Sequence, residues 1–310
     1  MLTLDNETVK DYLYNAHAAV IERMEEVFVD HSKGCTKMIP KTYLSFNKGD
    51  YRAMPAQWYG FAGIKWISVY PHNKKDFNLP TIYGTLILND LLTGEPLAIM
   101  DCGVLTAYRT AAVSAVAAKH LRDPEQPQNL AFIGCGYQAR LHAEMYSEVF
   151  PYIEHIDVYD TDEKQAREFF NWLQKQHIGS SWGVKSSIEG VCNEADIVTT
   201  LTPSTSPFLK LEHVKKGCHI NAIGADAEGK RELCDDILES SSLIIDDYEQ
   251  ASHSGEMQYN KDLPYLTLGD IITEAVPVIP AGLTVFDSTG VAIEDIAIGA
   301  LIYERYYNGN

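Results

Sequence analysis

The segment NLAFIGCGYQARLHAE at residues 129–144 limits the fold of this chain more than any other. A short apolar run leads into a Gly-Cys-Gly turn, and a helix-compatible stretch follows at 137–150. A strand, a glycine turn and a helix in this order form the first unit of a dinucleotide-binding fold. In such a unit Gly134 permits the tight turn, Gly136 lets the backbone approach a pyrophosphate, and Ala139 lets the helix pack closely on the strand. A tight turn without a ligand is the alternative.

An acidic residue stands where this fold requires one. The next predicted strand, 156–160, ends in Asp160, which lies 26 residues after Gly134 and near the offset at which a carboxylate receives ribose hydroxyls. The tripeptide that follows, Thr-Asp-Glu, offers no positive charge to a 2′-phosphate. We therefore expect NAD rather than NADP, bound by Gly134, Gly136, Tyr137, Gln138, Ala139 and Asp160.

Composition and charge disfavour several classes of partner. The 310 residues suffice for two domains, each with its own core. A formal net charge of −18 disfavours nucleic acid and anionic membranes. No apolar run approaches the roughly 18 residues of a membrane helix, and the N-terminus lacks the features of a signal peptide, so we expect a cytoplasmic protein. The six cysteines and ten histidines show no metal-binding spacing, and we expect no metal.

The N-terminal third predicts a helix followed by a sheet. Apolar residues at helical spacing predict one amphipathic helix over 9–30. Short apolar runs separated by Gly, Pro and Asn predict a mostly antiparallel sheet within 37–101, with its clearest strands at 63–70, 83–88 and 97–100. A hairpin turn at Thr93-Gly94 would join the last two of these strands.

A second helix is predicted over residues 105–121, which are rich in Ala, Ser and Val. Arg109 lies one turn into it, among small apolar neighbours. A buried guanidinium needs an anion, because an unpaired buried charge is very costly. The alternative is an exposed position on the outer face of the helix. The polar segment 122–127 has the composition of a linker, and we place a domain boundary there.

The rest of the chain alternates strands and helices, which predicts a parallel, doubly wound sheet with further strands at 195–202, 219–225, 242–246 and 283–287. Ligands of such sheets bind at the carboxyl ends of the strands. Asp226 directly follows one of these ends, and a helix N-cap or a turn is its alternative role. Ser288 or Thr289 is a candidate cap for the final helix, 291–306, and the alternative is that the same free N–H groups face a ligand.

Seven segments, in the right order over nearly the full length, resemble the ornithine cyclodeaminase/mu-crystallin family. They are YRAMP (51–55), GIKW (63–66), TGEPLAIMD (93–101), LTAYRTAAVSAVAAKHL (105–121), IGCGYQARLH (133–142), NAIGADAEGKREL (221–233) and DSTGVAIEDIAIG (287–299).

This resemblance implies an α/β fold in which a Rossmann domain, residues 122–287, is inserted into a smaller substrate-binding and dimerisation domain, residues 1–121 plus 288–310. It implies a homodimer and a small amino acid as substrate, whose carboxylate is held by Arg52, Lys65 and Arg109, with Thr289 also at the substrate. Without the resemblance, Lys65 would be an exposed strand lysine. Near the cofactor the resemblance places Thr81, Arg109, Thr202, Asn221, Ala222, Ile223, Lys230 and Ser288.

The chemistry that the resemblance implies begins with hydride transfer from Cα of the amino acid to NAD, which leaves an imine. In a cyclodeaminase the side-chain amine attacks that carbon, ammonia leaves and the hydride returns, giving proline from ornithine. In an alanine dehydrogenase water attacks instead and a 2-oxo acid leaves. Asp226 matches the family's catalytic carboxylate, and Asp226 or Lys65 would move the protons.

Three functions follow from this chemistry. We expect an ornithine cyclodeaminase acting on ornithine or a near relative. An NAD-dependent alanine dehydrogenase or cyclic imino acid reductase is the main alternative, and a non-catalytic mu-crystallin-like ligand binder is the third. The presence together of Arg52, Lys65, Arg109 and Asp226 disfavours the binder, which would not need them all.

Overall fold

The computed structural model describes residues 1–275 and 282–308, which divide into two units. The first unit contains Met1–Thr110 and Val291–Asn310, and the second contains Ala111–Gly290. The first division falls inside helix α4 (Gly103–Leu121), ahead of the boundary placed at its end. The predicted domain limits therefore stay a prediction, and the last two residues of 288–310 lie outside the described residues.

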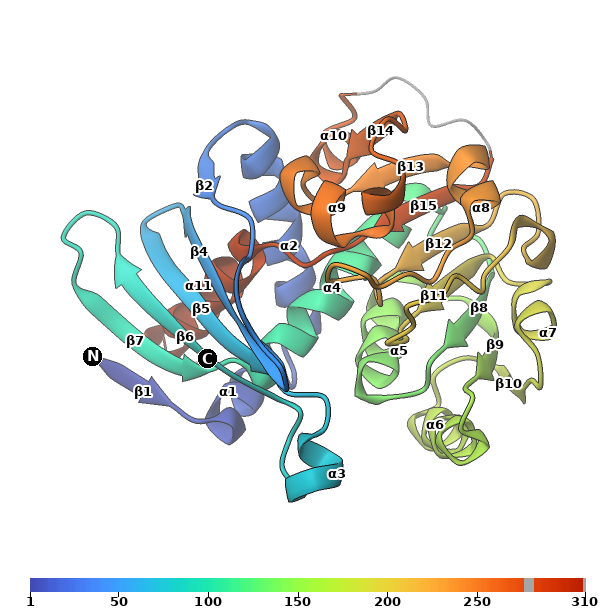
Figure 1. The fold of residues 1–310 in the computed structure, drawn as a ribbon, viewed down its shortest axis with the longest axis horizontal. Helices are drawn as coiled ribbons and strands as arrows, with labels where there is room; N and C mark the ends of the chain where they lie inside the picture. Colours follow the sequence, from blue (N-terminus) through green and yellow to red (C-terminus); the bar gives the residue numbers. More distant parts are fainter. Residues whose placement is uncertain (276–281, 309–310) are drawn as a thin grey trace. The chain divides into compact units, whose positions relative to one another are not determined.

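The first unit is built on a seven-stranded sheet whose pairs are antiparallel, except that the short β1 runs parallel to β7 (Figure 1). The predicted mostly antiparallel sheet is thus confirmed. The strands are β1 (Leu2–Leu4), β2 (Thr36–Met38), β3 (Thr42–Phe46), β4 (Gly49–Trp58), β5 (Phe61–Val69), β6 (Ile82–Asp90) and β7 (Pro96–Asp101). Their order is β1-β7-β6-β5-β4-β2, and β3 pairs with β4 as well.

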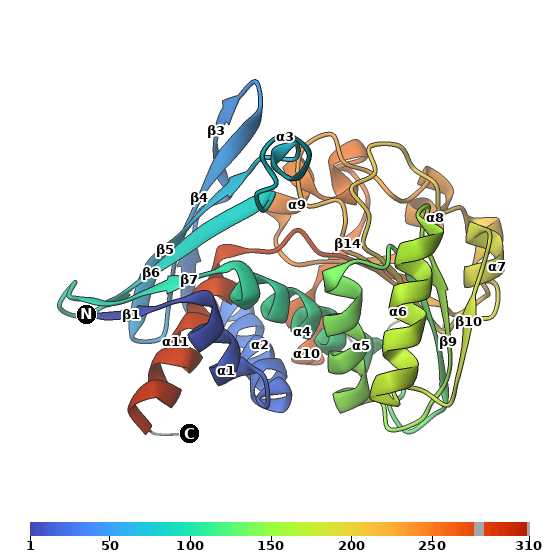
Figure 2. The ribbon, with the colours of Figure 1, turned by 90° about the horizontal axis from the view of Figure 1, so that it is seen from below.

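Helices α1 (Asn6–Leu13), α2 (His17–Ser32) and α11 (Ala292–Asn308) lie on one face of this sheet (Figure 2). Helix α11, from the C-terminal end of the chain, packs against β4, β5 and β6, and α2 packs against α11. The single helix predicted over 9–30 was wrong. Helix α1 ends at Leu13, with Tyr14 as its C-cap, and Ala16 leaves the helical region at φ −122°, because the intervening asparagine is a weak helix former that favours turns.

The second unit is built on an eight-stranded, fully parallel sheet with the order β10-β9-β8-β11-β12-β15-β13-β14. The strands are β8 (Gln128–Ile133), β9 (Ile153–Tyr159), β10 (Ser181–Val184), β11 (Ile197–Thr200), β12 (His219–Ala222), β13 (Ser242–Ile245), β14 (Tyr265–Thr267) and β15 (Thr284–Asp287). The predicted parallel sheet is confirmed. Two predicted strands end early, β11 at Thr200 and β12 at Ala222, where the backbone turns into loops.

Helices cover both faces of the parallel sheet, as a doubly wound fold requires. On one face Phe132 of β8 meets the rings of Tyr146 and Phe169. On the other face Ala131 belongs to an apolar cluster that includes Val191 and other buried residues. The helices of this unit, besides the second half of α4, are α5 (Tyr137–Val149), α6 (Glu163–Gln176), α7 (Ile188–Cys192), α8 (Asp235–Ser240), α9 (Tyr248–Ser254) and α10 (Leu268–Ile272).

Two short 3₁₀ turns, η1 (Leu211–His213) and η2 (Glu256–Tyr259), complete the second unit, and the five-residue helix α3 (Asn73–Phe77) completes the first. Within residues 1–275 and 282–308, none of the helices has the length and apolarity needed to cross a membrane.

Candidate functional site

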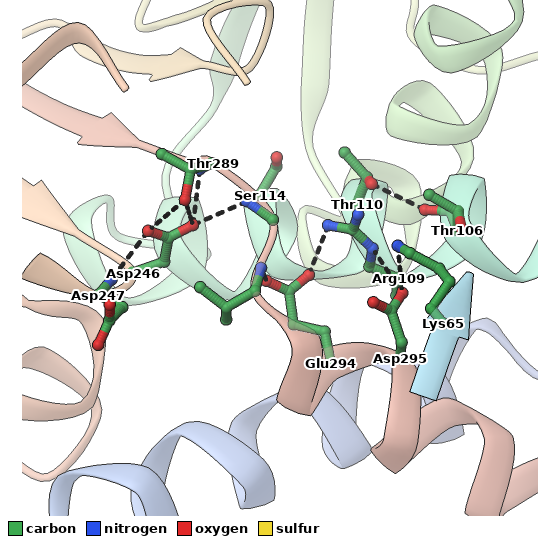
Figure 3. A network of polar contacts seen from close by, with 12 residues as sticks. Lys65, Thr106, Arg109, Thr110, Ser114, Asp246, Asp247, Thr289, Glu294 and Asp295 are labelled. Carbon is green, nitrogen blue, oxygen red and sulfur yellow. Dashed lines mark hydrogen bonds and ion pairs between the residues drawn. The ribbon is translucent and has the colours of Figure 1, made fainter. Parts of the chain in front are cut away.

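Two buried ion pairs form the polar centre of the first unit (Figure 3). The Nη1 of Arg109 on α4 donates to the Oε2 of Glu294 at 2.8 Å, and the Nζ of Lys65 on β5 donates to the Oδ1 of Asp295 at 2.8 Å. Asp295 also joins the two pairs, because its Oδ1 lies 3.4 Å from the Nε of Arg109. All four side chains are buried, so the outer-face position considered for Arg109 and the exposed position considered for Lys65 are both excluded.

The register of the sheet explains why a lysine is buried here. Lys65 on β5 stands opposite Met54 on β4, and Arg52 stands two residues before Met54 on the same face. This face of β4 is the buried one, and α11 packs against it. Arg52 and Lys65 are therefore diagonal neighbours on the covered face of one strand pair.

Arg52 has its own anion and its own aromatic neighbour. Its Nε donates to the Oδ1 of Asp50 at 2.7 Å, and its guanidinium lies 5.3 Å from the centroid of the Tyr43 ring. The structure thus collects Arg52, Lys65 and Arg109, the three predicted substrate residues, in the first unit. Their substrate-binding roles stay predictions.

Burial changes the proton affinities of this cluster. The pKa of Lys65 is lowered by burial, which outweighs the nearby negative charge of Asp295, and the positive charge of Arg109 lowers it further. The pKa of Glu294 is raised by burial, while Arg109 acts against that shift. The Oδ2 of Asp295 is buried and has no hydrogen-bond partner among the described residues. A buried lysine with a lowered pKa gives up its proton more readily, as proton transfer to or from a substrate requires.

The glycine turn of the second unit has the geometry of an anion site. Gly134 has φ +95°, and a Cβ there would lie 2.8 Å from the carbonyl oxygen of Leu201, so only glycine fits. Gly136 precedes α5 without any side-chain cap, and a Cβ there would meet no atom within 4 Å. The first turn of α5 holds no acidic residue. The N-terminus of this 13-residue helix is therefore open and positive.

Asp160 lies just past β9 and is tied to that turn. Its Oδ2 accepts a hydrogen bond from the backbone N–H of Cys135 at 2.8 Å, and its Oδ1 accepts one from the N–H of Asp162 at 2.9 Å. Its carboxylate is thus held at the edge of the glycine turn, and it is only partly buried.

Two predicted cofactor residues of this unit have buried side-chain oxygens without a hydrogen-bond partner among the described residues. The Oε1 of Gln138, in the first turn of α5, has no hydrogen-bond partner among the described residues, and the same holds for the Oγ of Ser288 just past β15. Buried polar atoms are nearly always hydrogen-bonded to protein, water or a ligand. Both residues were predicted to contact the cofactor, and their unpaired atoms are the kind that a bound nucleotide satisfies.

Other predicted cofactor and substrate residues already use their side chains within the protein. The Thr202 hydroxyl donates to Glu232 at 2.6 Å, the Asn221 amide donates to the Tyr146 hydroxyl at 2.8 Å, and the Thr289 hydroxyl donates to Asp246 at 2.9 Å. Because the Asn221 side chain is occupied, we expect Asn221 to contact a cofactor through its backbone. Ala222 and Ile223 have apolar side chains, so the same holds for their polar contacts. Thr81, in the first unit, precedes β6.

The predicted capping of the last helix was wrong. The Thr289 hydroxyl is bonded to Asp246, and it also accepts a hydrogen bond from the Gln250 side chain at 2.7 Å. The N–H of Val291 is instead bound by the Oε1 of Glu294 at 2.8 Å. The carboxylate of Glu294 therefore serves both the start of α11 and Arg109.

Asp226 stands four residues past β12, in a loop that leads into a turn. The N–H of Lys230 donates to the carbonyl of Ala227 at 3.2 Å, and Gly229 supplies φ +81°. Since no helix begins here, the N-cap alternative is excluded. The carboxylate of Asp226 pairs with the ammonium group of Lys230 at 2.5 Å, and 38% of its side chain is exposed.

The model of the ornithine cyclodeaminase/mu-crystallin family matches residues 4–310 of this chain. The chain belongs to this family. Members of the family that resemble it include the alanine dehydrogenase of Archaeoglobus fulgidus, 38% identical over an alignment of 318 positions that covers 100% of this chain and 96% of the relative.

Two further relatives show the range of activities named in the ornithine cyclodeaminase/mu-crystallin family. The ketimine reductase mu-crystallin of Mus musculus is 31% identical over 99% of this chain and 97% of its own. The ornithine cyclodeaminase of Brucella abortus is 33% identical over 86% of this chain and 74% of its own. Among solved structures, an archaeal alanine dehydrogenase dimer with bound NAD has a TM-score of 0.93 and 38% identity, covering 100% of this chain and 97% of that one.

Sequence reasoning missed the two carboxylates that pair with Lys65 and Arg109. Glu294 and Asp295 lie in DSTGVAIEDIAIG, a segment quoted for the family resemblance, yet neither was assigned a role. The signal was present, because two adjacent acids in the otherwise apolar first part of the helix, AIEDIAIGALI, require buried cations as partners. Glu232 and Asp246 were also missed, and nothing in their local sequence marks them as buried.

Proposed function

We propose that this chain is an NAD-dependent enzyme that acts at Cα of a small amino acid, or on the corresponding imine. The observation that carries the proposal is the buried cluster of Lys65 and Arg109 with Glu294 and Asp295, on a chain whose family relatives are named as amino-acid and imine enzymes. NAD, when bound, supplies the acceptor or donor of a hydride. The open helix N-terminus, the unpaired Gln138 and Ser288 oxygens and the carboxylate of Asp160 support NAD as the cofactor.

The substrate carboxylate is assigned to Arg52, Lys65 and Arg109. Arginine offers two parallel N–H donors that match the two oxygens of a carboxylate. In the structure the guanidinium of Arg109 already reaches one carboxylate at hydrogen-bond distance and lies near a second. Its position is therefore fixed before a substrate arrives, which reduces the ordering cost of binding.

Proton transfer is assigned to Lys65 and Asp226. Because burial lowers its pKa, Lys65 is the better suited of the two to exchange a proton with a substrate amine or with water. Asp226 is exposed enough to reach a ligand, and its pairing with Lys230 shows that its carboxylate can bind an ammonium group.

Net oxidation of a small amino acid, as in an alanine dehydrogenase, is the favoured outcome. The relative that matches over the whole chain at 38% identity is an alanine dehydrogenase, whereas the ornithine cyclodeaminase at 33% covers 86% of the chain. The cyclodeaminase that the sequence favoured remains the second candidate. The ion pair of Asp226 with Lys230 supports it, since a distal amine of ornithine would make the same kind of contact.

One assay separates these outcomes. The protein is incubated with NAD and a panel containing alanine, ornithine and other amino acids, and NADH absorbance and ammonia are both followed. Ammonia with equal NADH supports the dehydrogenase, and ammonia without NADH supports the cyclodeaminase. If neither forms, and proline and cyclic imino acids produce no change in either direction with NAD or NADH, the enzymatic proposal fails.

We also propose a homodimer formed through the first unit. The strands β3 to β6 expose large apolar side chains, and the rings of Tyr51 and Trp66 stack with centroids 5.3 Å apart. Apolar surface of this kind marks protein interfaces. The exposed residues are Tyr43, Leu44, Phe46, Trp66, Ile82 and Tyr83. Light scattering at micromolar concentration tests this, and a monomer there would contradict it.

A further inference from the structure

One buried carboxylate in the second unit joins the loops that follow two neighbouring strands. The Oε1 of Glu232 accepts hydrogen bonds from the backbone N–H and the hydroxyl of Thr202, at 2.7 and 2.6 Å. Its Oε2 accepts from the Thr200 hydroxyl at 2.6 Å and from the N–H of Gly224 at 2.9 Å. Thr202 follows β11, and Gly224 follows β12.

The four donors to Glu232 are all uncharged. Its side chain is 0% exposed, and no ion pair to it occurs in the described part of the chain. Burial raises the pKa of Glu232, and the hydrogen bonds from Thr200, Thr202 and Gly224 lower it again. A buried carboxyl group without a cation is expensive, so its presence here calls for a role that these hydrogen bonds fulfil.

The loop after β12 is shaped around this carboxylate. A Cβ at Gly224 would lie 2.5 Å from the Oε1 of Glu232 and 2.2 Å from the carbonyl oxygen of Thr202, so only glycine allows the approach. The carbonyl of Gly224 then accepts a hydrogen bond from the N–H of Asp226 at 3.0 Å. The position of the Asp226 backbone thus depends on Glu232 through a single intervening residue, Gly224.

Glu232 is itself held by a second buried carboxylate, and that one by a third. The Oε1 of Glu256 accepts from the N–H groups of Glu232 and Leu233, at 2.7 and 3.2 Å. The carboxylate of Asp287, at the end of β15, accepts from the N–H groups of Glu256 and Met257, at 3.0 and 2.9 Å. Each carboxylate fixes the backbone of the next. The three carboxylates thus act in series on the backbone, from Asp287 to Glu256 and from Glu256 to Glu232.

We propose that Glu232 is a positioning residue that sets the loops after β11 and β12, and through them the cofactor contacts of Thr202 and the placement of Asp226. This inference rests on the proposed function, in which those loops serve NAD and the proton transfer. In this role Glu232 acts through the two loops and not by contact with substrate or cofactor, since both its oxygens are taken up by Thr200, Thr202 and Gly224. Its carboxylate accepts a hydrogen bond from one backbone N–H of each loop and so holds the two loops together.

The test replaces Glu232 with Gln, which keeps the size but brings a donor amide against donor groups. NAD binding is measured by calorimetry, and kcat and the KM for the amino acid are measured with melting temperature on the same preparation. Leaving buried donors of the two loops without an acceptor costs roughly a factor of 10 to 100 in an equilibrium constant. The Kd for NAD should therefore rise, and kcat should fall, by roughly 10- to 100-fold. The KM for the amino acid should stay within about twofold, since Arg52, Lys65 and Arg109 are unchanged.

Glu228→Gln is the matched control, because Glu228 is exposed in the adjacent turn and loses the same charge. It should leave the Kd and kcat unchanged. Should the Glu232→Gln protein fail to fold, Thr200→Val removes a single hydroxyl donor from the same carboxylate and should change the Kd and kcat in the same direction by a smaller factor.

Three results would overturn the inference: an unchanged Kd and kcat in folded Glu232→Gln, an equal change in the Glu228→Gln control, or folded Thr200→Val with normal kinetics. The unmodified protein is measured first. If it binds no NAD, the proposed function fails, and that outcome is distinct from a failure of the positioning role, in which the unmodified protein binds NAD and the variants bind it equally well.

Discussion

The ammonium group of Lys65 lies 2.8 Å from the carboxylate of Asp295, and neither side chain is more than 1% exposed. These two residues are 230 positions apart, so the pair joins a central strand of the first sheet to the C-terminal helix. The same Asp295 oxygen lies 3.4 Å from Arg109. A single carboxylate therefore sets the arrangement of two residues assigned to the substrate.

Replacing Asp295 with Asn should destabilise the protein strongly. Lys65 would lose its carboxylate while remaining buried, and removing one partner of a buried ion pair costs about 3–5 kcal/mol. Denaturant unfolding measures the loss. Glu26→Gln is the control, since the pair of Glu26 with Arg23 is half-exposed and should contribute little. Similar stabilities of the two variants would show that the buried pair carries no special weight.

Replacing Asp226 with Asn should separate a proton-transfer role from a structural one. Loss of a general base typically lowers the rate by about 10²–10⁴. Because Asp226 is partly exposed and caps no helix, the melting temperature should hardly change. Both quantities are measured on one preparation. A near-normal kcat would remove Asp226 from the mechanism and leave its pairing with Lys230 as a surface contact.

The preference for NAD over NADP should depend on Asp160. Replacing Asp160 with Ser and Thr161 with Arg removes a negative charge and adds a positive one where a 2′-phosphate would lie, so the ratio of the two affinities should shift toward NADP. Because Asp160 also holds the N–H of Cys135, overall affinity should fall as well. Thr161→Arg alone separates the effects, since it keeps that hydrogen bond. Tighter NADP than NAD binding by the unmodified protein in calorimetry would refute the assignment.

Acid should destabilise the second unit through His142. Burial lowers its pKa to about 4, and its ring is bonded to Ser114 and to the carbonyl of Gln138. Unfolded histidine binds a proton near pH 6.5, so as the pH falls from about 6.5 to about 4 the unfolded state gains a proton that the folded state does not. Stability is lost over this window, by up to roughly 3 kcal/mol.

The comparison that isolates this effect is His142→Gln, with unfolding measured at several pH values between 4 and 7. The variant should lose less stability on acidification than the unmodified protein. Asp287 acts with the opposite sign, because burial raises its pKa to about 7 and its contribution, full below pH 3.8, is lost as the pH rises toward 7. It is present in both proteins, so it cancels in the difference. If the free energy of unfolding changes equally with pH in the two proteins, His142 does not govern the acid response.

The sequence predicted those parts of the fold that depend on residues close together in the chain. The glycine turn, the parallel strands and the helix of Arg109 follow from periodicity and small residues. The break between α1 and α2 was missed, because apolar spacing alone continued across it. Asn15, a weak helix former that favours turns, marks the break, and its effect was not weighed against the apolar spacing.

Only those residues of the candidate site that stand in a recognisable sequence motif could be predicted. The family motifs identified Lys65 and Arg109, yet burial of Lys65 depends on α11 covering its strand, and α11 lies at the far end of the chain. Glu232 could not be found from sequence, because its four donors come from three separate residues of two different loops and strands. Such partners become visible only when the strands are assembled.

The most direct test of the central claim follows the hydrogen on Cα. The protein is incubated with NAD and with alanine deuterated at Cα, or with whichever amino acid the panel shows to be turned over, and the cofactor and product are analysed by mass spectrometry. The account predicts deuterium in the reduced nicotinamide, or, for a cyclodeaminase, its transient appearance there and its return to the cyclic product. Turnover with all the deuterium released to water would contradict hydride transfer from Cα and with it the proposed function.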